Sequence, residues 1–164
     1  MRRAVRILTT GGTFDKVHDW REEQLAFAGE GASQVPAVLS DGRCDFPFLE
    51  HVMQLDSLDM TDEDRAYLAE RANAAPEPGL VVTHGTSTLG RTARFLAERV
   101  REKTLVLTGA MRPHAFFVSD AGFNLGGALI AAQTLSPGVY AVMNGRVFGA
   151  AEVAKNEELG RFDR

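Results

Sequence analysis

The sequence predicts an α/β fold, a doubly wound and mostly parallel sheet flanked by helices, in a three-layer sandwich of the flavodoxin or Rossmann kind. Two observations predict it. Short β-rich runs alternate with helical patterns along the chain. These runs end on glycine or on hydroxyl residues, as strands do where the chain turns toward a helix.

The first half of the chain predicts two strands and one helix. Residues 4–9 form an apolar run that ends at a glycine pair. Residues 34–39 fit a weaker strand, because a turn signal follows them. Thr61 is a suitable N-cap for a helix over residues 61–73, and the acidic residues at its start favour the positive end of the helix dipole.

The second half predicts three strands and two helices in alternation. Residues 80–83 and 104–108 have the composition of buried strands. Between them, apolar residues recur at helical spacing over residues 89–101. Residues 120–133 form a helix that is apolar on most sides, so we expect it to be well buried and capped by its first residue. Residues 139–143 form the last expected strand, before an Asn-Gly turn pair.

Length and composition limit the classes of function. A chain of 164 residues fits one domain, residues 1–164. A net charge of −4 predicts no nucleic-acid partner. No apolar run approaches the roughly 20 residues of a membrane-spanning helix, so no membrane partner is predicted. The single cysteine, Cys44, cannot form an internal disulfide, which fits a reducing compartment and predicts a cytoplasmic location.

Polar residues gather where the expected strands end, at the edge where doubly wound sheets bind ligands. They supply hydroxyl groups, glycines and backbone N–H groups in three segments, residues 10–18, 84–88 and 109–119. A threonine hydroxyl is a weak nucleophile that needs a base or a lysine beside it. Lys103, just before one of the strands, is a candidate for that lysine.

Simpler interpretations of these residues stay open. The hydroxyl-rich turn can be a helix cap, and Lys103 can be a solvated surface residue. The glycine pair can face a nucleotide phosphate, although neither the full dinucleotide fingerprint nor a P-loop is present. The four histidines have no metal-ligand spacing, so no metal site is predicted.

Taken together and in order, these motifs resemble the N-terminal domain of bacterial-type L-asparaginases over nearly the whole chain. The residues that carry the resemblance are Thr10-Gly11-Gly12-Thr13, Asp56-Ser57-Leu58-Asp59-Met60, His84-Gly85-Thr86-Ser87-Thr88, Gly109-Ala110-Met111-Arg112-Pro113 with Asp120 and Phe123-Asn124-Leu125, and Val142-Met143-Asn144.

The resemblance implies an amidohydrolase with a threonine nucleophile that acts on linear amides. Thr13 would attack a side-chain carboxamide and form an acyl-enzyme. Thr86, Ser87 and Lys103 match the family's Thr-Asp-Lys triad, and backbone N–H groups near Gly12 and Thr86 would stabilise the oxyanion.

The resemblance also implies the rest of the site. The expected substrate-binding residues are Gly12, Ser57, Leu58, Gly85 and Ala110, with Ser57 at the substrate α-carboxylate. The substrate is L-asparagine or a related small amide, and no metal or organic cofactor is implied. Because family sites are completed across subunits, we expect a homodimer or a higher homo-oligomer.

Three departures from the family pattern affect the choice of substrate. Ser87 stands where the family has an aspartate, and His18 follows the motif where shorter members have a tyrosine. His18 can be a base or a loop residue. The family's C-terminal domain has no counterpart in residues 1–164. Two of these changes remove acceptors for an α-ammonium group, so we expect poor asparagine affinity or an amide without a free α-amine.

Other functions remain compatible with the sequence. The chain can be a catalytically weakened relative that binds an amino acid or a small amide. The same threonine can hydrolyse another amide, an ester or a lactam. The segment 20–49 is a candidate lid, with Phe14 and Trp20 as candidates for packing or gating there.

Overall fold

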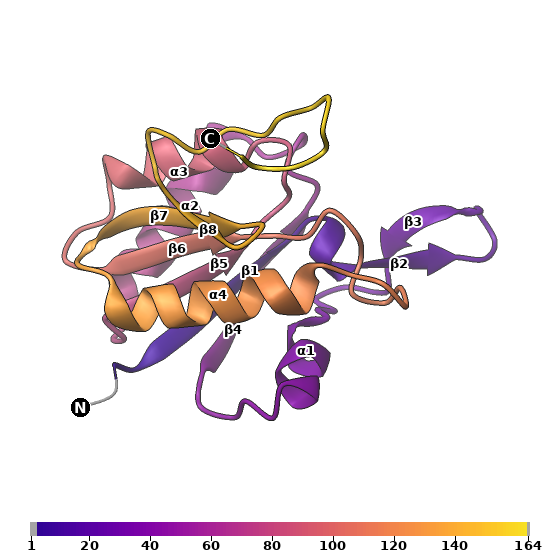
Figure 1. Ribbon diagram of the computed structural model, residues 1–164, viewed down its shortest axis with the longest axis horizontal. Helices are drawn as coiled ribbons and strands as arrows, with labels where there is room; N and C mark the ends of the chain where they lie inside the picture. Colours follow the sequence, from indigo (N-terminus) through magenta and orange to yellow (C-terminus); the bar gives the residue numbers. More distant parts are fainter. Residues whose placement is uncertain (1–2, 164) are drawn as a thin grey trace.

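The centre of the computed structural model, which describes residues 3–163, is a six-stranded sheet in the order β4-β1-β5-β6-β7-β8 (Figure 1). The strands β4, β1, β5, β6 and β7 are parallel to one another, and β8 is antiparallel to β7. Their bounds are Val5–Gly11 (β1), Phe48–Leu55 (β4), Gly79–Thr83 (β5), Thr104–Thr108 (β6), Gly138–Met143 (β7) and Arg146–Gly149 (β8). Numbered in chain order, the parallel strands follow the flavodoxin-like order 2-1-3-4-5, which confirms the predicted fold class.

Helices cover both faces of the sheet, and each face has its own core. The helices α2 and α3 pack on one face, and α1 and α4 pack on the other (Figure 1). Their bounds are Val35–Asp41 (α1), Asp62–Ala74 (α2), Leu89–Ala97 (α3) and Ala121–Thr134 (α4). Along β6, Leu105 and Leu107 enter one core and Val106 enters the other, as the two-residue period of a strand requires.

Residues 34–39 are not a strand, contrary to the prediction. They lie mostly in α1, where Pro36 occupies the first turn and so removes no helical hydrogen bond. Val35 and Val38 fall on the buried side of this helix, in the same core as α4. The apolar residues of this run therefore form the buried side of a helix and not a strand of the sheet.

Two strands of the central sheet were not predicted. β4 lies at one edge of the sheet and is mostly half-buried or exposed, and Glu50, His51 and Gln54 interrupt the apolar run that an inner strand has. β8 follows the predicted turn pair, in which Asn144 and Gly145 have φ angles of 52° and 77°. Two such residues form a tight hairpin turn, and β8 pairs back onto β7 through it.

A separate hairpin projects from the body of the protein (Figure 1). It consists of β2 (Lys16–Asp19) and β3 (Gln24–Phe27). The expected lid over residues 20–49 is therefore not one element, since its later part forms α1 and the start of β4. Phe14 is fully buried in the core and Trp20 is 87% exposed on the hairpin.

The helix α4 is buried on one side only, although the sequence predicted burial on most sides. Leu125, Ala128 and Ala132 face the core, whereas Phe123 and Ile130 are 68% and 62% exposed. Among residues 3–163, no helix is both long enough and apolar enough to cross a membrane.

Candidate active site

The carboxyl ends of the parallel strands meet at one edge of the sheet. The strand order changes direction between β1 and β5, because β4 lies beyond β1 while β6 and β7 lie beyond β5. Doubly wound sheets bind ligands in the crevice at such a switch point. The loops that follow β1 and β5 carry Thr13 and Thr86, so the topology brings these two predicted site residues to the switch point.

Gly12 lets the backbone after β1 touch the turn after β5. Its φ of 75° and ψ of −175° are open to glycine and strained for other residues. A Cβ at Gly12 would lie 2.5 Å from the amide nitrogen of Gly85, closer than real Cβ atoms come. Thr13 follows directly, as the first residue of the short 3-10 helix η1 (Thr13–Asp15). Because Gly12 has no side chain, Thr13 can lie close to the turn after β5.

Ser57 is held against the same turn by Gly85 and Thr88. A Cβ at Gly85 would lie 2.6 Å from both Cβ and Oγ of Ser57. The Thr88 amide donates to Ser57 Oγ at 3.3 Å, and the Thr88 hydroxyl donates to the Ser57 carbonyl at 2.8 Å. Ser57 is buried, while the neighbouring predicted residue, Leu58, is 72% exposed at the surface.

His84 is a structural residue of this turn. Its Nδ1 lies 2.7 Å from the Gly85 carbonyl oxygen, which can only accept, so Nδ1 carries the proton. Its Nε2 lies 3.2 Å from the sulfur of Met60. Complete burial lowers the pKa of the His84 imidazole to about 4, so the ring is neutral at pH 7. The ring thus joins the Gly85 turn to the loop that carries Ser57.

Arg65 is fully buried and connects the same two loops from beneath. Its guanidinium donates to the Met60 carbonyl at 2.8 Å, to the Thr88 hydroxyl at 3.3 Å and to the Thr92 hydroxyl at 2.9 Å. We did not identify this residue from the sequence. Arg65 lies on the buried side of α2, in line with Leu68 and Ala72. This position in the helical pattern could have identified it from the sequence.

The loop after β6 brings Ala110 to the edge, where it is fully buried. Asp120 was expected to cap α4, but its carboxylate instead accepts from the amides of Met111 and Arg112 at 3.0 Å. Asn124 donates to the Gly109 carbonyl at 3.0 Å and to Asp120 at 2.9 Å. Asp120, just before α4, and Asn124, in its first turn, therefore hold this loop in place.

Lys103 lies at the opposite end of the sheet from Thr86. It precedes β6, whose first residue pairs with Gly79 at the start of β5. The five residues of β6 separate it from the site edge by about 17 Å. Its amine donates to the carbonyls of Ala75 and Glu77 at 2.6 and 3.1 Å. The structure therefore does not bring Lys103 to Thr86, contrary to the prediction.

A different lysine lies beside the hydroxyl-rich turn. Lys155 follows β8 and lines a cavity of about 250 Å³ together with Thr86 and Ser87. Its side chain is 15% exposed, and its amine lies 3.4 Å from a carboxylate oxygen of Glu157. The sequence analysis missed it because no periodic pattern covers this segment. Because the chain has only three lysines, considering each of them in turn for the site could have identified Lys155.

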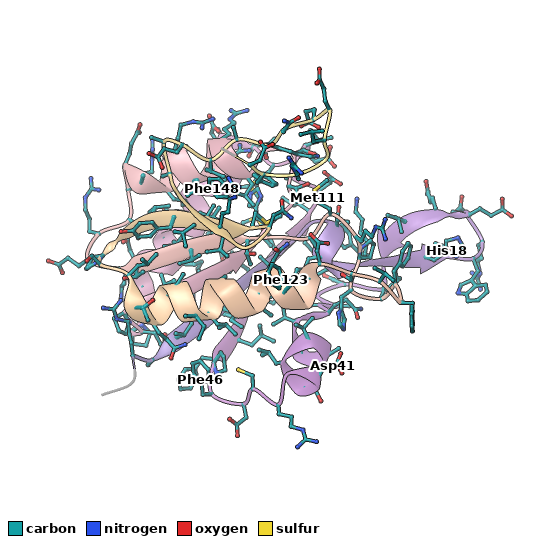
Figure 2. All side chains as sticks on the ribbon, in the orientation of Figure 1. His18, Asp41, Phe46, Met111, Phe123 and Phe148 are labelled. Carbon is teal, nitrogen blue, oxygen red and sulfur yellow. The ribbon has the colours of Figure 1, made fainter. Side chains whose placement is uncertain are left out.

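His18 is not brought to Thr13. It is an exposed residue of β2, and its ring packs edge-to-face on Trp20 at 5.9 Å between ring centroids. Figure 2 shows His18 on the projecting hairpin, away from the sheet. The contact between the hairpin base and the site is made by Lys16, whose amine lies 2.6 Å from a carboxylate oxygen of Asp56. This ion pair lowers the pKa of the Asp56 carboxyl.

Within residues 3–163, no three His, Cys, Asp or Glu side chains gather in an arrangement that could hold a metal ion. The donors at the site edge include hydroxyl groups, backbone amides and the Lys155 amine. Such a set suits nucleophilic attack on a carbonyl carbon and stabilisation of the resulting oxyanion.

Comparison with known proteins gives one consistent family. Residues 4–161 match the family model described as "Asparaginase, N-terminal". The chain is 34% identical to a probable periplasmic L-asparaginase of Haemophilus influenzae, over 92% of this chain and 46% of that protein. It is 38% identical to L-asparaginase 2 of Escherichia coli, over 65% of this chain and 32% of that protein.

Solved structures show the same similarity. A thermostable L-asparaginase from Thermococcus kodakarensis matches with a TM-score of 0.83 and 30% identity, over 98% of this chain and 50% of that one. A probable cytoplasmic L-asparaginase from Campylobacter jejuni matches with a TM-score of 0.81 and 29% identity, over 99% of this chain and 53% of that one. The chain thus spans about half the length of these two structures.

The buried His84 predicts that acid destabilises the fold. Its pKa is about 4 when folded and about 6.5 when unfolded, so its contribution to stability is complete above pH 6.5 and is lost as pH falls toward 4. The loss reaches about 3 kcal/mol near pH 4. Urea denaturation between pH 7 and 4.5 should show a shallower pH dependence for His84→Gln than for the wild type. Equal slopes would contradict the prediction.

The close contact at Gly85 predicts a steric cost for any side chain there. Gly85→Ala places a methyl group against Ser57, so the free energy of unfolding should fall by about 1–3 kcal/mol. Gly29→Ala is the matched control, since a Cβ there meets nothing within 4 Å. Denaturant titration of both variants tests this. Equal stability of the two would show that the turn has room for a side chain.

Proposed function

Because the chain belongs to the asparaginase N-terminal family, we propose that it hydrolyses a side-chain carboxamide to the acid and ammonia. One observation carries the proposal. Thr13 lies at the switch point next to the turn that holds Thr86, and Lys155 shares a cavity with Thr86. A threonine nucleophile needs such a neighbour to exchange its proton.

The proposed reaction has two steps. The hydroxyl oxygen of Thr13 attacks the amide carbon, the C–N bond breaks, and the nitrogen leaves as ammonia with the proton from the hydroxyl. Water then attacks the resulting ester, which releases the acid and restores the Thr13 hydroxyl. The backbone amides near Gly12 and Thr86 would stabilise the negative oxygen in both steps, where one donor is worth about 10²–10³ in rate.

We assign to Lys155 the role first predicted for Lys103. It lines the cavity with Thr86 and Ser87, and it is mostly covered by protein. A lysine amine that shares a cavity with Thr86 would supply the proton exchange that the first step requires. Lys103 instead binds two backbone carbonyls at the far end of the sheet.

The charges near the site favour an amide without a free α-amine. Ser87 offers no negative charge to a substrate ammonium group. Two carboxylates near these residues are already paired: Asp56, next to Ser57 in the chain, with Lys16 at 2.6 Å, and Glu157, which lines the same cavity as Ser87, with Lys155 at 3.4 Å. We therefore infer that the deaminated analogue of asparagine is a better substrate than asparagine itself.

Two further expectations belong to this proposal. We infer that the chain forms a homodimer or a higher homo-oligomer. We also infer a cytoplasmic location. Among the relatives, one is named as periplasmic and one as cytoplasmic.

Substitution of the two lysines tests the assignment of the site. Thr13→Ala should reduce kcat/KM for ammonia release by more than about 10³-fold, and Lys155→Met by roughly 10²–10⁴-fold. Lys103→Met is the matched control and should keep its activity within a few-fold, with lower stability. The measurement is ammonia release from asparagine, glutamine and simple amides. Undiminished activity of Thr13→Ala, or equal losses for both lysine variants, would show that the site is assigned wrongly.

A comparison of asparagine with its deaminated analogue, succinamic acid, tests the substrate. The wild type should have the higher kcat/KM for succinamic acid. Ser87→Asp should raise kcat/KM for asparagine, because it restores an acceptor for the ammonium group, whereas the neutral control Ser87→Asn should not. A low KM for asparagine in the wild type, or no effect of Ser87→Asp, would rule out this account of specificity.

A further inference from the structure

The cavity that Lys155 shares with the hydroxyl-rich turn has more positive than negative side chains on its walls. Among the described residues, these walls carry the cations of Arg91, Arg94 and Lys155 and a single carboxylate, that of Glu157. The whole chain has the opposite balance, with a net charge of −4. Like charges on the walls of a cleft focus the electrostatic potential there and attract ions of the opposite sign. This cavity therefore attracts anions, although the protein as a whole is acidic.

Gly90 lets the chain after β8 lie against the first turn of α3. A Cβ at Gly90 would lie 2.5 Å from the Val153 carbonyl oxygen, so any side chain there would displace this segment. The same Cβ would lie 3.5 Å from Nη1 of Arg94, so the guanidinium of Arg94 lies beside the space left by the glycine. Figure 1 shows the last part of the chain beside α3. The fold thus brings two arginines of α3 and Lys155 of the last segment to one cavity.

The carboxylates near these three cations neutralise them only in part. Arg91 lies 2.9 Å from Oδ1 of Asp62, but the same oxygen also accepts from Arg65 at 3.1 Å. The carboxylate on the cavity wall is 3.4 Å from the Lys155 amine, which is longer than a charge-assisted hydrogen bond of about 2.7–2.9 Å. Within residues 3–163, Arg94 forms no ion pair. An anion in the cavity would give these donors further acceptors.

We propose that this cavity binds a small oxyanion, of the phosphate or carboxylate class, held by Arg91, Arg94 and the Lys155 amine. A guanidinium presents paired N–H donors whose geometry matches the oxygens of carboxylates and phosphates. The Ser87 hydroxyl, on the same wall, can donate a further hydrogen bond. The volume of about 250 Å³ is several times the roughly 30 Å³ that one water occupies in the liquid, so such an ion fits with water beside it.

The oxyanion can reach the cavity as a free ion or as a group of the substrate. Thr86 and Ser87 line this cavity and also belong to the proposed site of amide hydrolysis, so a substituent of the bound amide can extend into it. In both cases the oxyanion attracts the Lys155 amine, which the proposed reaction uses for proton exchange. This consequence for catalysis rests on the proposed function, whereas the binding of the anion does not.

Calorimetric titration of the whole protein with inorganic phosphate, at fixed ionic strength, tests the site. The wild type should bind phosphate saturably. Arg94→Met should raise the Kd by at least about tenfold, and Glu157→Gln should lower it, because the second change removes the carboxylate on the cavity wall. The matched control, Arg101→Met, removes an equal charge beyond the last residue of α3, where Arg101 donates to backbone carbonyls, and should leave the Kd unchanged. The absence of saturable binding, or equal effects of Arg94→Met and Arg101→Met, would overturn the proposal.

Ammonia release in the presence of phosphate distinguishes the two sources of the oxyanion. If a group of the substrate occupies the cavity, phosphate should raise KM and leave kcat unchanged; if a free ion occupies it, phosphate should lower kcat. In both cases Arg94→Met should weaken the inhibition by the factor by which it weakens binding. Inhibition that Arg94→Met leaves unaltered would overturn the link between the cavity and Lys155.

The two measurements keep this inference separate from the proposed reaction. Saturable phosphate binding by a protein that releases no ammonia from any amide would refute the proposed hydrolysis alone. Ammonia release by a protein that binds no phosphate would refute the oxyanion site alone.

Discussion

The backbone contact between Gly12 and Gly85 is the constraint on which the site depends. Neither residue has room for a side chain, because Gly12 meets Gly85 and Gly85 meets Ser57. Gly109 meets the carbonyl oxygen of His84 in the same way. Loops from three neighbouring strands therefore touch through their backbones. The position of Thr13 relative to the turn after β5 is set by the sheet and not by flexible side chains, which is the kind of support that a catalytic group needs.

Buried and half-buried polar groups extend this support below the loops. Arg65 bonds to Met60 and Thr88, the neutral His84 bonds to Gly85, and Asp120 bonds to the amides of the loop after β6. Burying these groups without partners would cost several kcal/mol in total, so their hydrogen bonds specify one arrangement of the loops. These polar groups thus hold the loops of the site edge in place.

Much of this architecture could be predicted from local patterns, and the failures have physical causes. The inner strands could be predicted from their apolar composition, and α3 from the helical spacing of its apolar residues. The helix α2 could be predicted from its cap and acidic first turn, and α4 from its apolar run. Residues 34–39 have an apolar run that fits a strand or one side of a helix, and only tertiary packing decides between them. Thr13 and Thr86 could be placed because both directly follow strands. Lys155 could not, since it reaches the site through the irregular chain after β8.

The two edge strands of the sheet, β4 and β8, have features that oppose pairing with the sheet of another copy of this protein. An open strand edge is a template for pairing with another chain, and charges along it discourage such pairing. At the β4 edge, Glu50 forms ion pairs with Arg6 and Arg71 at 2.9 and 2.8 Å. At the other margin the parallel array stops at β8, a strand of only four residues. The charges beside β4 and the shortness of β8 therefore both disfavour amyloid-like stacking through the sheet while the protein stays folded.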